Sequence, residues 1–211
     1  GEGGAVYTRN PLLHKIIRSM RDWGRDCICP SGKDNLCGHR FDRQFGTLPL
    51  GYDHKYTYSH FGYNLKATDL QAAVGCAQLE KFSSFVERRK ENFARLYKGL
   101  ECLQNKLILP EPVENGSPSW FGFLITCKEG TERTELVKKI ESANIQTRAL
   151  FAGNLTRHPC FDQIRGTDAY RVIGDLAVTD RIMRDTFWVG VYPGMTDAML
   201  DRMVDVIGGV S

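Results

Sequence analysis

Long hydrophobic runs and an excess of charge of one sign are both missing from this sequence. Even the longest apolar runs are short, as at Ala72–Val74. A membrane-spanning helix needs about 20 apolar residues, so we expect no membrane span. The 28 Lys and Arg residues nearly balance the 25 Asp and Glu residues. No basic stripe is interleaved with aromatic residues, so we expect no nucleic-acid partner.

Several familiar catalytic motifs are also missing. The sequence has no Ser/His/Asp set, no paired-carboxylate motif, no Walker A loop and no dinucleotide fingerprint after a strand. A dense, even disulfide framework is absent as well, because four of the seven cysteines are dispersed. Cys76 and Cys127 lie within apolar patterns and are expected in the core. This cysteine usage favours a reducing, cytoplasmic location.

What the sequence does have is a group of three cysteines. Cys27, Cys29 and Cys37 lie in the stretch CICPSGKDNLC, whose Gly, Pro and Asn residues predict a loop. Thiolates bind zinc or iron–sulfur clusters, usually with four ligands. His39 offers a fourth ligand for a Cys3His zinc site, and a fourth thiolate elsewhere would equally complete an iron–sulfur cluster. Three unpaired loop cysteines are the remaining interpretation, and spacing alone leaves all three open.

The N-terminal half predicts helices on both sides of this long loop. Asn10 is a good N-cap with Pro11 at the first helical position, and Gly24 closes that helix. Residues 25–58 show no periodicity, and ordered loops of this length are usually functional. A short strand is expected at Ala5–Thr8. A Thr68/Gln71 capping box opens a helix from Asp69 to about Lys81, which is expected to pack through Leu70, Ala73, Val74 and Ala77. A second capping box at Ser84–Glu87 opens a longer helix.

After a proline-rich connector, the C-terminal half alternates strands and helices. The pattern predicts strands at 119–127, 145–149 and 186–191 and helices at 131–143, 168–180 and after Thr196, the last with Met199, Leu200, Met203 and Ile207 inward. This order is typical of a small α+β domain with helices on one face of a few strands. We expect the domain boundary within or just before the helix that ends near residue 103.

Four polar residues stand out beside the cysteines. Asn64 and Lys66 precede the capped helix start, where free N–H groups, an amide and an ammonium suit a phosphate; an ordinary capped turn is the alternative. Arg148 ends a predicted strand, a position suited to carboxylate or phosphate recognition, although a surface arginine is the alternative. His158 lies in the loop that follows and is either structural or part of a pocket.

Several stretches of the chain match a known pattern. They are GEGGAV at Gly1–Val6, RDWGR at Arg21–Arg25, the block GYNLKATDLQAA at Gly62–Ala73, and Thr147-Arg148. Together they resemble the sugar aminotransferases of the DegT/StrS type, in which a glycine-rich segment follows the pyridoxal-phosphate lysine and a Gly-Tyr-Asn block comes later. The resemblance covers essentially the whole chain.

This resemblance implies an α/β fold, the C-terminal part of a fold-type I pyridoxal-phosphate-dependent transferase. Residues 1–103 are then the end of the large cofactor domain, with the cysteine loop at 25–58 as an insertion, and residues 104–211 are a small C-terminal α+β domain. A catalytic residue is expected just before Gly1, so we expect none within this chain. The 211 residues alone are expected to be inactive.

The cysteine loop resembles one branch of that family, the CDP-6-deoxy-4-hexulose-3-dehydrases. Enzymes of that branch use pyridoxamine phosphate and a 2Fe-2S cluster to remove the 3-hydroxyl of a nucleotide sugar. The resemblance implies three roles for residues of this chain. Cys27, Cys29 and Cys37 are the implied cluster ligands, with a fourth cysteine upstream. Asn64 is implied to hold the cofactor phosphate from the neighbouring subunit of a homodimer, together with Lys66, which stands where relatives have Arg. Arg148 is implied to bind the nucleotide sugar, with His158 lining the pocket.

The same branch implies the partners. They are a CDP-linked 4-keto-6-deoxy sugar on the route to a 3,6-dideoxysugar of O-antigen or lipopolysaccharide, and an iron–sulfur flavin reductase that supplies electrons. Two alternatives stay open. A pyridoxal-phosphate sugar aminotransferase of the same fold requires a lysine just upstream of Gly1. A zinc-stabilised interaction module without catalysis requires only the cysteine loop.

Overall fold

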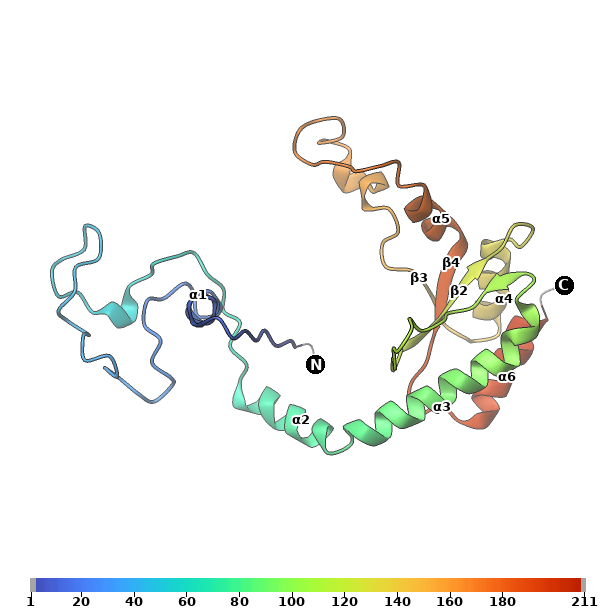
Figure 1. The fold of residues 1–211 in the computed structure, drawn as a ribbon, viewed down its shortest axis with the longest axis horizontal. Helices are drawn as coiled ribbons and strands as arrows, with labels where there is room; N and C mark the ends of the chain where they lie inside the picture. The colour runs from blue at the N-terminus through green and yellow to red at the C-terminus, as the bar shows by residue number, and fades with distance from the viewer. Residues whose placement is uncertain (1–2, 210–211) are drawn as a thin grey trace. The chain divides into compact units, whose positions relative to one another are not determined.

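The chain divides into two compact units, residues 1–78 and 79–211 (Figure 1). The computed structural model describes residues 3–209, so Gly1 and Glu2 of the glycine-rich start lie outside the described residues. The long helix at Phe82–Leu100 belongs to the second unit, whereas the predicted domain division after residue 103 placed it in the first. That division concerns the complete protein and stays a prediction.

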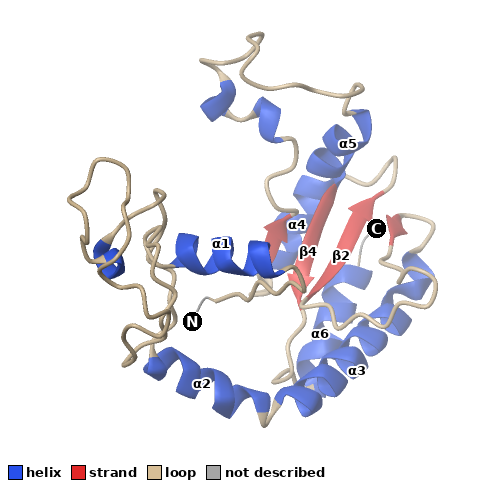
Figure 2. Cartoon of the chain, turned by 60° about the vertical axis from the view of Figure 1, so that its left-hand side comes forward, coloured by secondary structure: helices blue, strands red, loops and turns tan. Residues whose placement is uncertain are grey.

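The second unit holds the sheet, and both units hold helices (Figure 2). The helices are α1 (Pro11–Arg21), α2 (Asp69–Leu79), α3 (Phe82–Leu100), α4 (Arg133–Ser142), α5 (Ala177–Asp185) and α6 (Asp197–Gly208); the strands are β1 (Leu107–Ile108), β2 (Gly122–Cys127), β3 (Thr147–Ala149) and β4 (Thr186–Gly190). Short 3-10 helices occur at His54–Tyr56, Glu101–Leu103, Leu155–Arg157 and Pro159–Phe161.

The first unit is organised by local hydrogen bonds. The Asn10 side chain accepts hydrogen bonds from the N–H groups of Leu12 (2.9 Å) and Leu13 (3.2 Å), so the predicted N-cap of α1 is confirmed. The Thr68 N–H donates to the Gln71 side chain at 2.8 Å, and the Gln71 N–H donates back at 3.3 Å, which confirms the capping box of α2. The strand predicted at 5–8 is wrong, because those residues pair with no other segment that the structure describes.

Apolar side chains along α1 and α2 are exposed within this unit. They include Leu12, Leu13, Ile16, Leu70 and Val74. The prediction that α2 packs through its Leu70 face is therefore wrong for the described residues, since nothing in residues 3–209 covers that face. Cys76 is exposed for the same reason, contrary to the expected core position.

The second unit is a four-stranded antiparallel sheet with the order β1-β2-β4-β3. On β2 and β4 the register sets Phe123 opposite Val189 and Ile125 opposite Phe187. Burial alternates along β2, as expected for a strand with one face on a core. The two-residue strand β1 was not predicted, because it is too short to show a periodicity.

Helices cover one face of this sheet. Phe123, Ile125 and Cys127 of β2 and Phe187 and Val189 of β4 point into the core, and α3, α4 and α6 meet them with Leu96, Leu100, Leu136, Ile140, Leu200 and Ile207. All these residues lie in the second unit. The predicted α+β arrangement and the core position of Cys127 are confirmed, and burial raises the pKa of the Cys127 thiol to about 11.

Three details of the second unit differ from prediction. Helix α3 begins at Phe82, and Ser84 lies in its first turn with its hydroxyl donating to the Lys81 carbonyl at 2.8 Å, so Ser84 is not an N-cap. The helix predicted at 168–180 is wrong, since α5 spans Ala177–Asp185. Met199 of α6 is 42% exposed although the pattern placed it inward. Local capping signals misplaced the starts of both helices, and helical spacing misplaced Met199.

Candidate functional site

The loop that carries the three cysteines is closed at its base by backbone hydrogen bonds. The Gly24 carbonyl accepts from the N–H groups of Ser59 (2.9 Å) and His60 (3.2 Å), and the Trp23 N–H donates to the Tyr63 carbonyl at 2.9 Å. Gly24 has a φ of +80°, and a Cβ there would lie 2.0 Å from the His60 carbonyl oxygen. Only glycine fits this position without moving the backbone.

The Gly-Tyr-Asn block packs against the same base. A Cβ at Gly62 would lie 2.2 Å from the Gly24 nitrogen, so the two glycines permit one close approach of backbone to backbone. Asn64 forms an antiparallel bridge with Asp22, and Arg25 bridges to Tyr58. The predicted phosphate block and the cysteine loop are therefore one connected structure.

Cys29 and Cys37 lie close enough to Cys27 to affect the ionisation of its thiol. Burial is the main cause that raises the pKa of the Cys27 thiol, and the neighbouring Cys29 and Cys37 raise it further. None of the three is in a disulfide. The Arg18 guanidinium donates to the Ile28 carbonyl at 2.9 Å, which ties the loop to α1 between the first two cysteines.

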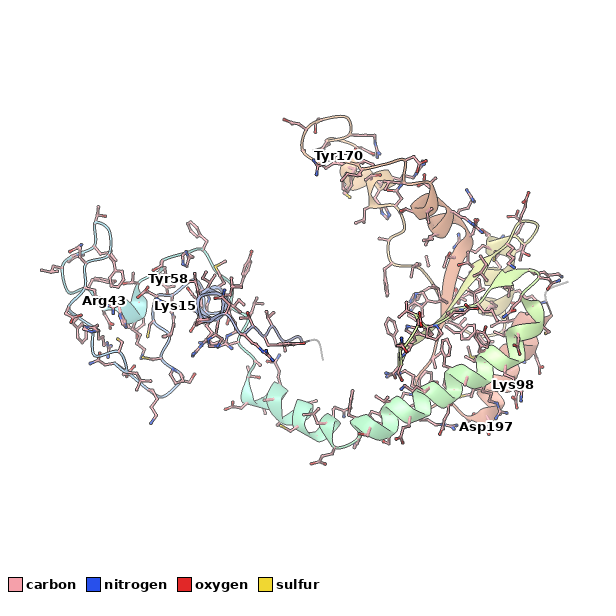
Figure 3. The ribbon with its side chains drawn as sticks, viewed as in Figure 1. Lys15, Arg43, Tyr58, Lys98, Tyr170 and Asp197 are labelled. Carbon is pink, nitrogen blue, oxygen red and sulfur yellow. The ribbon has the colours of Figure 1, made fainter. Side chains whose placement is uncertain are left out.

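A hollow of about 420 Å³ opens beside the cysteines. Its lining includes Cys29, Cys37 and His54 together with the cations Lys15, Arg18 and Arg43. Lys15 and Arg43 are labelled in Figure 3. Asp26 lines the hollow as well, so the three cations outnumber its one carboxylate. The hollow therefore combines soft ligands with a field that suits an anionic cluster.

His54 is a functional candidate that the sequence reasoning missed. Its side chain is 4% exposed, and its Nε2 atom lies 3.6 Å from the Cys37 sulfur. The position follows an Asp in an aromatic-rich part of the loop, and no spacing rule singles it out. His39, the histidine that the zinc interpretation used, instead directs its Nδ1 at Asp42, 2.7 Å away.

The thiols are close but are not arranged around a single ion. Among residues 3–209, no three Cys, His, Asp or Glu side chains form a group that could hold a metal ion as they stand. The donors are nonetheless of the type that iron–sulfur clusters take, and a 2Fe-2S cluster spreads four ligands over two irons. Three unpaired thiols on one anchored loop fit such a cluster as an incomplete set.

The two predicted phosphate ligands differ in their surroundings. Lys66 is paired with Asp22, with Nζ 3.1 Å from Oδ1, and its ammonium lies 5.2 Å from the centre of the Trp23 ring. Asn64 is exposed, so its amide is accessible to a ligand. A phosphate would have to compete with Asp22 for the Lys66 charge.

Arg148 and His158 belong to the second unit. Arg148 is exposed and donates to the carbonyl of Thr147 at 2.8 Å. His158 contacts the Ala152 carbonyl through Nε2 at 2.6 Å. Within the described residues no hydrogen bond or ion pair joins the two side chains, so the structure does not bring them together as one binding pair.

An aromatic groove of about 430 Å³ lies on the face of the sheet opposite the core. Trp188 is its centre, with Phe121 edge-on at 5.3 Å and Phe151 at 5.8 Å between ring centroids. Trp120 and Phe121 both line it. The alternation along β2 and β4 could have predicted that Trp188 faces away from the core.

Comparison with known proteins assigns the chain to a family. The model of the DegT/DnrJ/EryC1/StrS aminotransferase family matches residues 1–208. The chain belongs to this family. The predicted family is thereby confirmed, as is the fold class of a fold-type I pyridoxal-phosphate-dependent transferase.

Individual members of the DegT/DnrJ/EryC1/StrS family give the degree of similarity. The lipopolysaccharide biosynthesis protein RfbH of Salmonella typhimurium is 59% identical over 206 residues, 97% of this chain and 46% of that protein. The dTDP-4-dehydro-2,6-dideoxy-D-glucose 3-dehydratase of Saccharopolyspora spinosa is 54% identical over 98% of this chain and 44% of that protein. The chain thus spans about half the length of these curated relatives.

A solved family structure shares the fold. It is the E. coli GDP-4-keto-6-deoxy-D-mannose-3-dehydratase with bound hydrated PLP, which superimposes with a TM-score of 0.64 at 24% identity, over 73% of this chain and 39% of that chain. In residues 3–209 no helix is both long and apolar enough to cross a membrane.

Proposed function

We propose that this chain is the C-terminal part of a nucleotide-sugar 3-dehydratase that uses pyridoxamine phosphate and a 2Fe-2S cluster. Its substrate would be a CDP-linked 4-keto-6-deoxyhexose, on the route to a 3,6-dideoxysugar of lipopolysaccharide. Similarity to a 3-dehydratase and to a lipopolysaccharide biosynthesis protein supports the reaction class. The cluster and the CDP group are the parts of the proposal that need a direct test.

The observation that carries the proposal is the arrangement of the cysteine loop. Its three thiols are free, Cys29 and Cys37 lie within electrostatic reach of Cys27, and the same two cysteines line a mainly cationic hollow. The loop is anchored to the Gly-Tyr-Asn block by the Asp22–Asn64 bridge. An aminotransferase needs no electron carrier, whereas a deoxygenation needs two electrons from outside, so such a loop next to a cofactor block favours the dehydratase.

The residues of this chain would have distinct tasks. Cys27, Cys29 and Cys37 would hold the cluster together with a fourth cysteine outside this chain, and the cluster would supply single electrons. Asn64 would bind the cofactor phosphate of the neighbouring subunit in a homodimer, with Lys66 contributing charge once Asp22 releases it. When bound, pyridoxamine phosphate supplies an amine for the 4-keto group and a ring that accepts electrons.

The second unit would recognise the nucleotide sugar. Arg148 is exposed at the sheet and suits a diphosphate, because a guanidinium presents a planar pair of donors. His158 would line the sugar pocket from a separate position, because no hydrogen bond or ion pair joins it to Arg148 in the described residues. Seven free cysteines support the cytoplasmic location that the proposal includes.

The test uses the complete protein that contains this chain, purified without oxygen. We expect about equal amounts of iron and acid-labile sulfide, and a visible absorption that dithionite removes. With pyridoxamine phosphate, an iron–sulfur flavin reductase and NADH, the protein should consume a CDP-4-keto-6-deoxyhexose and release its 3-deoxy product.

Two results would overturn the proposal. A colourless protein that contains zinc and no iron would indicate the zinc-stabilised module. A lysine immediately before the glycine-rich segment, together with glutamate-dependent formation of an amino sugar, would indicate the aminotransferase. Replacing the CDP sugar with its dTDP counterpart tests the nucleotide separately, because the Saccharopolyspora spinosa relative is named for a dTDP sugar.

A further inference from the structure

His54 is the buried histidine of the cysteine loop, and it contacts a cysteine through its ring. Its side chain is 4% exposed and its Nε2 atom lies 3.6 Å from the Cys37 sulfur, within the range of hydrogen bonds to sulfur. His39 lies closer to Cys37 in sequence, yet its ring is turned to Asp42. The fold therefore directs one of two histidine rings at the sulfur, which also accepts from the backbone N–H of His39 at 3.4 Å.

The orientation of the His54 ring is held from several directions. The backbone N–H of His54 donates to the Arg40 carbonyl at 3.1 Å, and the Asp53 side chain caps the short 3-10 helix in which His54 lies. The Arg40 guanidinium binds both oxygens of Asp53, at 3.0 and 2.7 Å, and this bidentate pair lowers the pKa of the Asp53 carboxyl. Phe45 packs edge-on against the ring. Such support is typical of a side chain whose position matters to a site.

The surroundings also select the tautomer. Nδ1 of His54 is buried and, among residues 3–209, has no hydrogen-bond partner. A hydrogen on Nδ1 would be a buried donor without an acceptor, which is costly. The favoured tautomer therefore carries its hydrogen on Nε2, directed at Cys37. A metal-bound cysteine is a thiolate and can only accept.

We propose that His54 donates a hydrogen bond from Nε2 to the sulfur of Cys37 and thereby raises the reduction potential of the cluster that this sulfur binds. The inference rests on the proposed function, which makes Cys37 a cluster ligand. A hydrogen bond to a ligand sulfur stabilises the reduced cluster most, because reduction adds negative charge to the sulfurs. His54 is thus a positioning and tuning residue, separate from the ligands.

The experiment compares midpoint potentials in the complete protein, purified without oxygen. His54→Leu removes the donor, His54→Gln retains an N–H donor, and His39→Gln is the matched control from the same loop. Redox titration followed by visible absorption and by EPR of the reduced cluster gives each potential. We expect His54→Leu to be about tenfold harder to reduce at equilibrium, which is a fall of about 59 mV for one electron, with His54→Gln between it and wild type and His39→Gln unchanged.

A second measurement keeps the inference testable if His54→Leu fails to bind iron. Pulsed EPR of the reduced His39→Gln protein, labelled with 15N-histidine, should show a weak nitrogen coupling that His54→Gln removes. No histidine coupling, or an unchanged potential in iron-loaded His54→Leu, would overturn the inference. A coupling as strong as that of a bound ligand would also overturn it, because His54 would then bind iron directly.

The outcome for the proposed function can be told apart. A wild-type protein without iron and sulfide would refute the cluster itself and the inference with it. An iron-loaded wild type whose potential does not respond to His54 would leave the proposed function in place and refute the role of His54 alone.

Discussion

At the level of single residues, Gly62 explains why a glycine begins the Gly-Tyr-Asn block. A Cβ at this position would lie 2.2 Å from the Gly24 nitrogen and 2.7 Å from the Met20 carbonyl oxygen. Both contacts are with backbone, which has no side-chain rotamer by which to yield. The glycine therefore serves the closure of the cysteine loop as well as the block that follows it.

We predict that Gly62→Ala opens the base of the cysteine loop. The added methyl group must displace the α1–Gly24 backbone, at a cost of about 1–3 kcal/mol by analogy with overpacked cores. Limited proteolysis within residues 25–58 of the complete protein should become faster, and bound iron should fall. The matched control is Gly75→Ala in α2, where a Cβ has nothing within 4 Å, so stability should be unchanged or raised by about 1 kcal/mol. Equal behaviour of the two variants would contradict the prediction.

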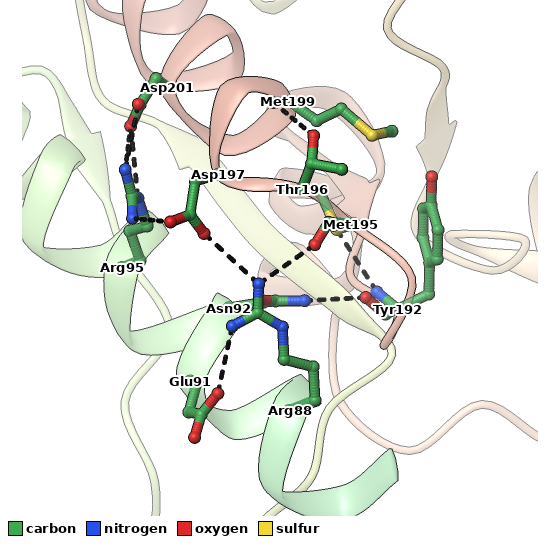
Figure 4. A network of polar contacts seen from close by, with 10 residues as sticks. All are labelled: Arg88, Glu91, Asn92, Arg95, Tyr192, Met195, Thr196, Asp197, Met199 and Asp201. Carbon is green, nitrogen blue, oxygen red and sulfur yellow. Dashed lines mark hydrogen bonds and ion pairs between the residues drawn. The ribbon is translucent and has the colours of Figure 1, made fainter. Parts of the chain in front are cut away.

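At the level of elements, α3 is held to residues 192–208, which include α6, by one buried polar contact and by exposed ion pairs (Figure 4). Asn92 of α3 is 1% exposed and donates from Nδ2 to the Tyr192 carbonyl at 2.8 Å. Arg95 binds Asp197 and Asp201 at the exposed edge of the same pair of helices. Buried hydrogen bonds cannot be replaced by water, whereas exposed ion pairs can.

We therefore predict that Asn92→Ala destabilises the protein by about 1–3 kcal/mol, because the Tyr192 carbonyl loses its buried donor. Arg95→Ala should cost clearly less, although it removes more visible contacts. Urea unfolding followed by the fluorescence of the tryptophans reports both values. If Arg95→Ala proved the more damaging, the ion pairs rather than the buried amide would join these helices.

At the level of the whole molecule, the hydrophobic core is confined to one of the two units. The buried apolar residues run from Leu96 to Ile207. In the first unit, the described buried side chains are the polar Ser19, His54 and Thr57. A segment stabilised by local hydrogen bonds and ion pairs alone cannot offset the conformational entropy of folding.

From this contrast we predict that residues 79–211 fold on their own, whereas residues 1–78 do not. The isolated second unit should show a cooperative thermal transition by circular dichroism and slow hydrogen exchange along β2 and β4. The isolated first unit should show neither, with or without iron. A cooperative transition in residues 1–78 alone would refute the prediction.

Much of the local structure was predictable from the sequence, because its causes are local. The caps of α1, α2 and α6, the irregular segment at 25–58 and the alternation along β2 all follow from neighbouring residues. The predictions were wrong for the start of α3, the extent of α5 and the burial of Cys76. Each of these features depends on packing between distant segments. The site showed the same division, with the cysteines found by spacing and His54 missed.

The family and the three thiols of one loop can be recognised without a structure, since motifs and spacing are properties of the chain. The histidine ring that faces the sulfur of Cys37, and the pairing of Lys66 with Asp22, emerge in the folded chain alone. The fold also places Trp188 and Phe121 in a groove on the open face of the sheet. The physical reason is that hydrogen bonds and ion pairs depend on distances of a few ångströms between residues far apart in the chain.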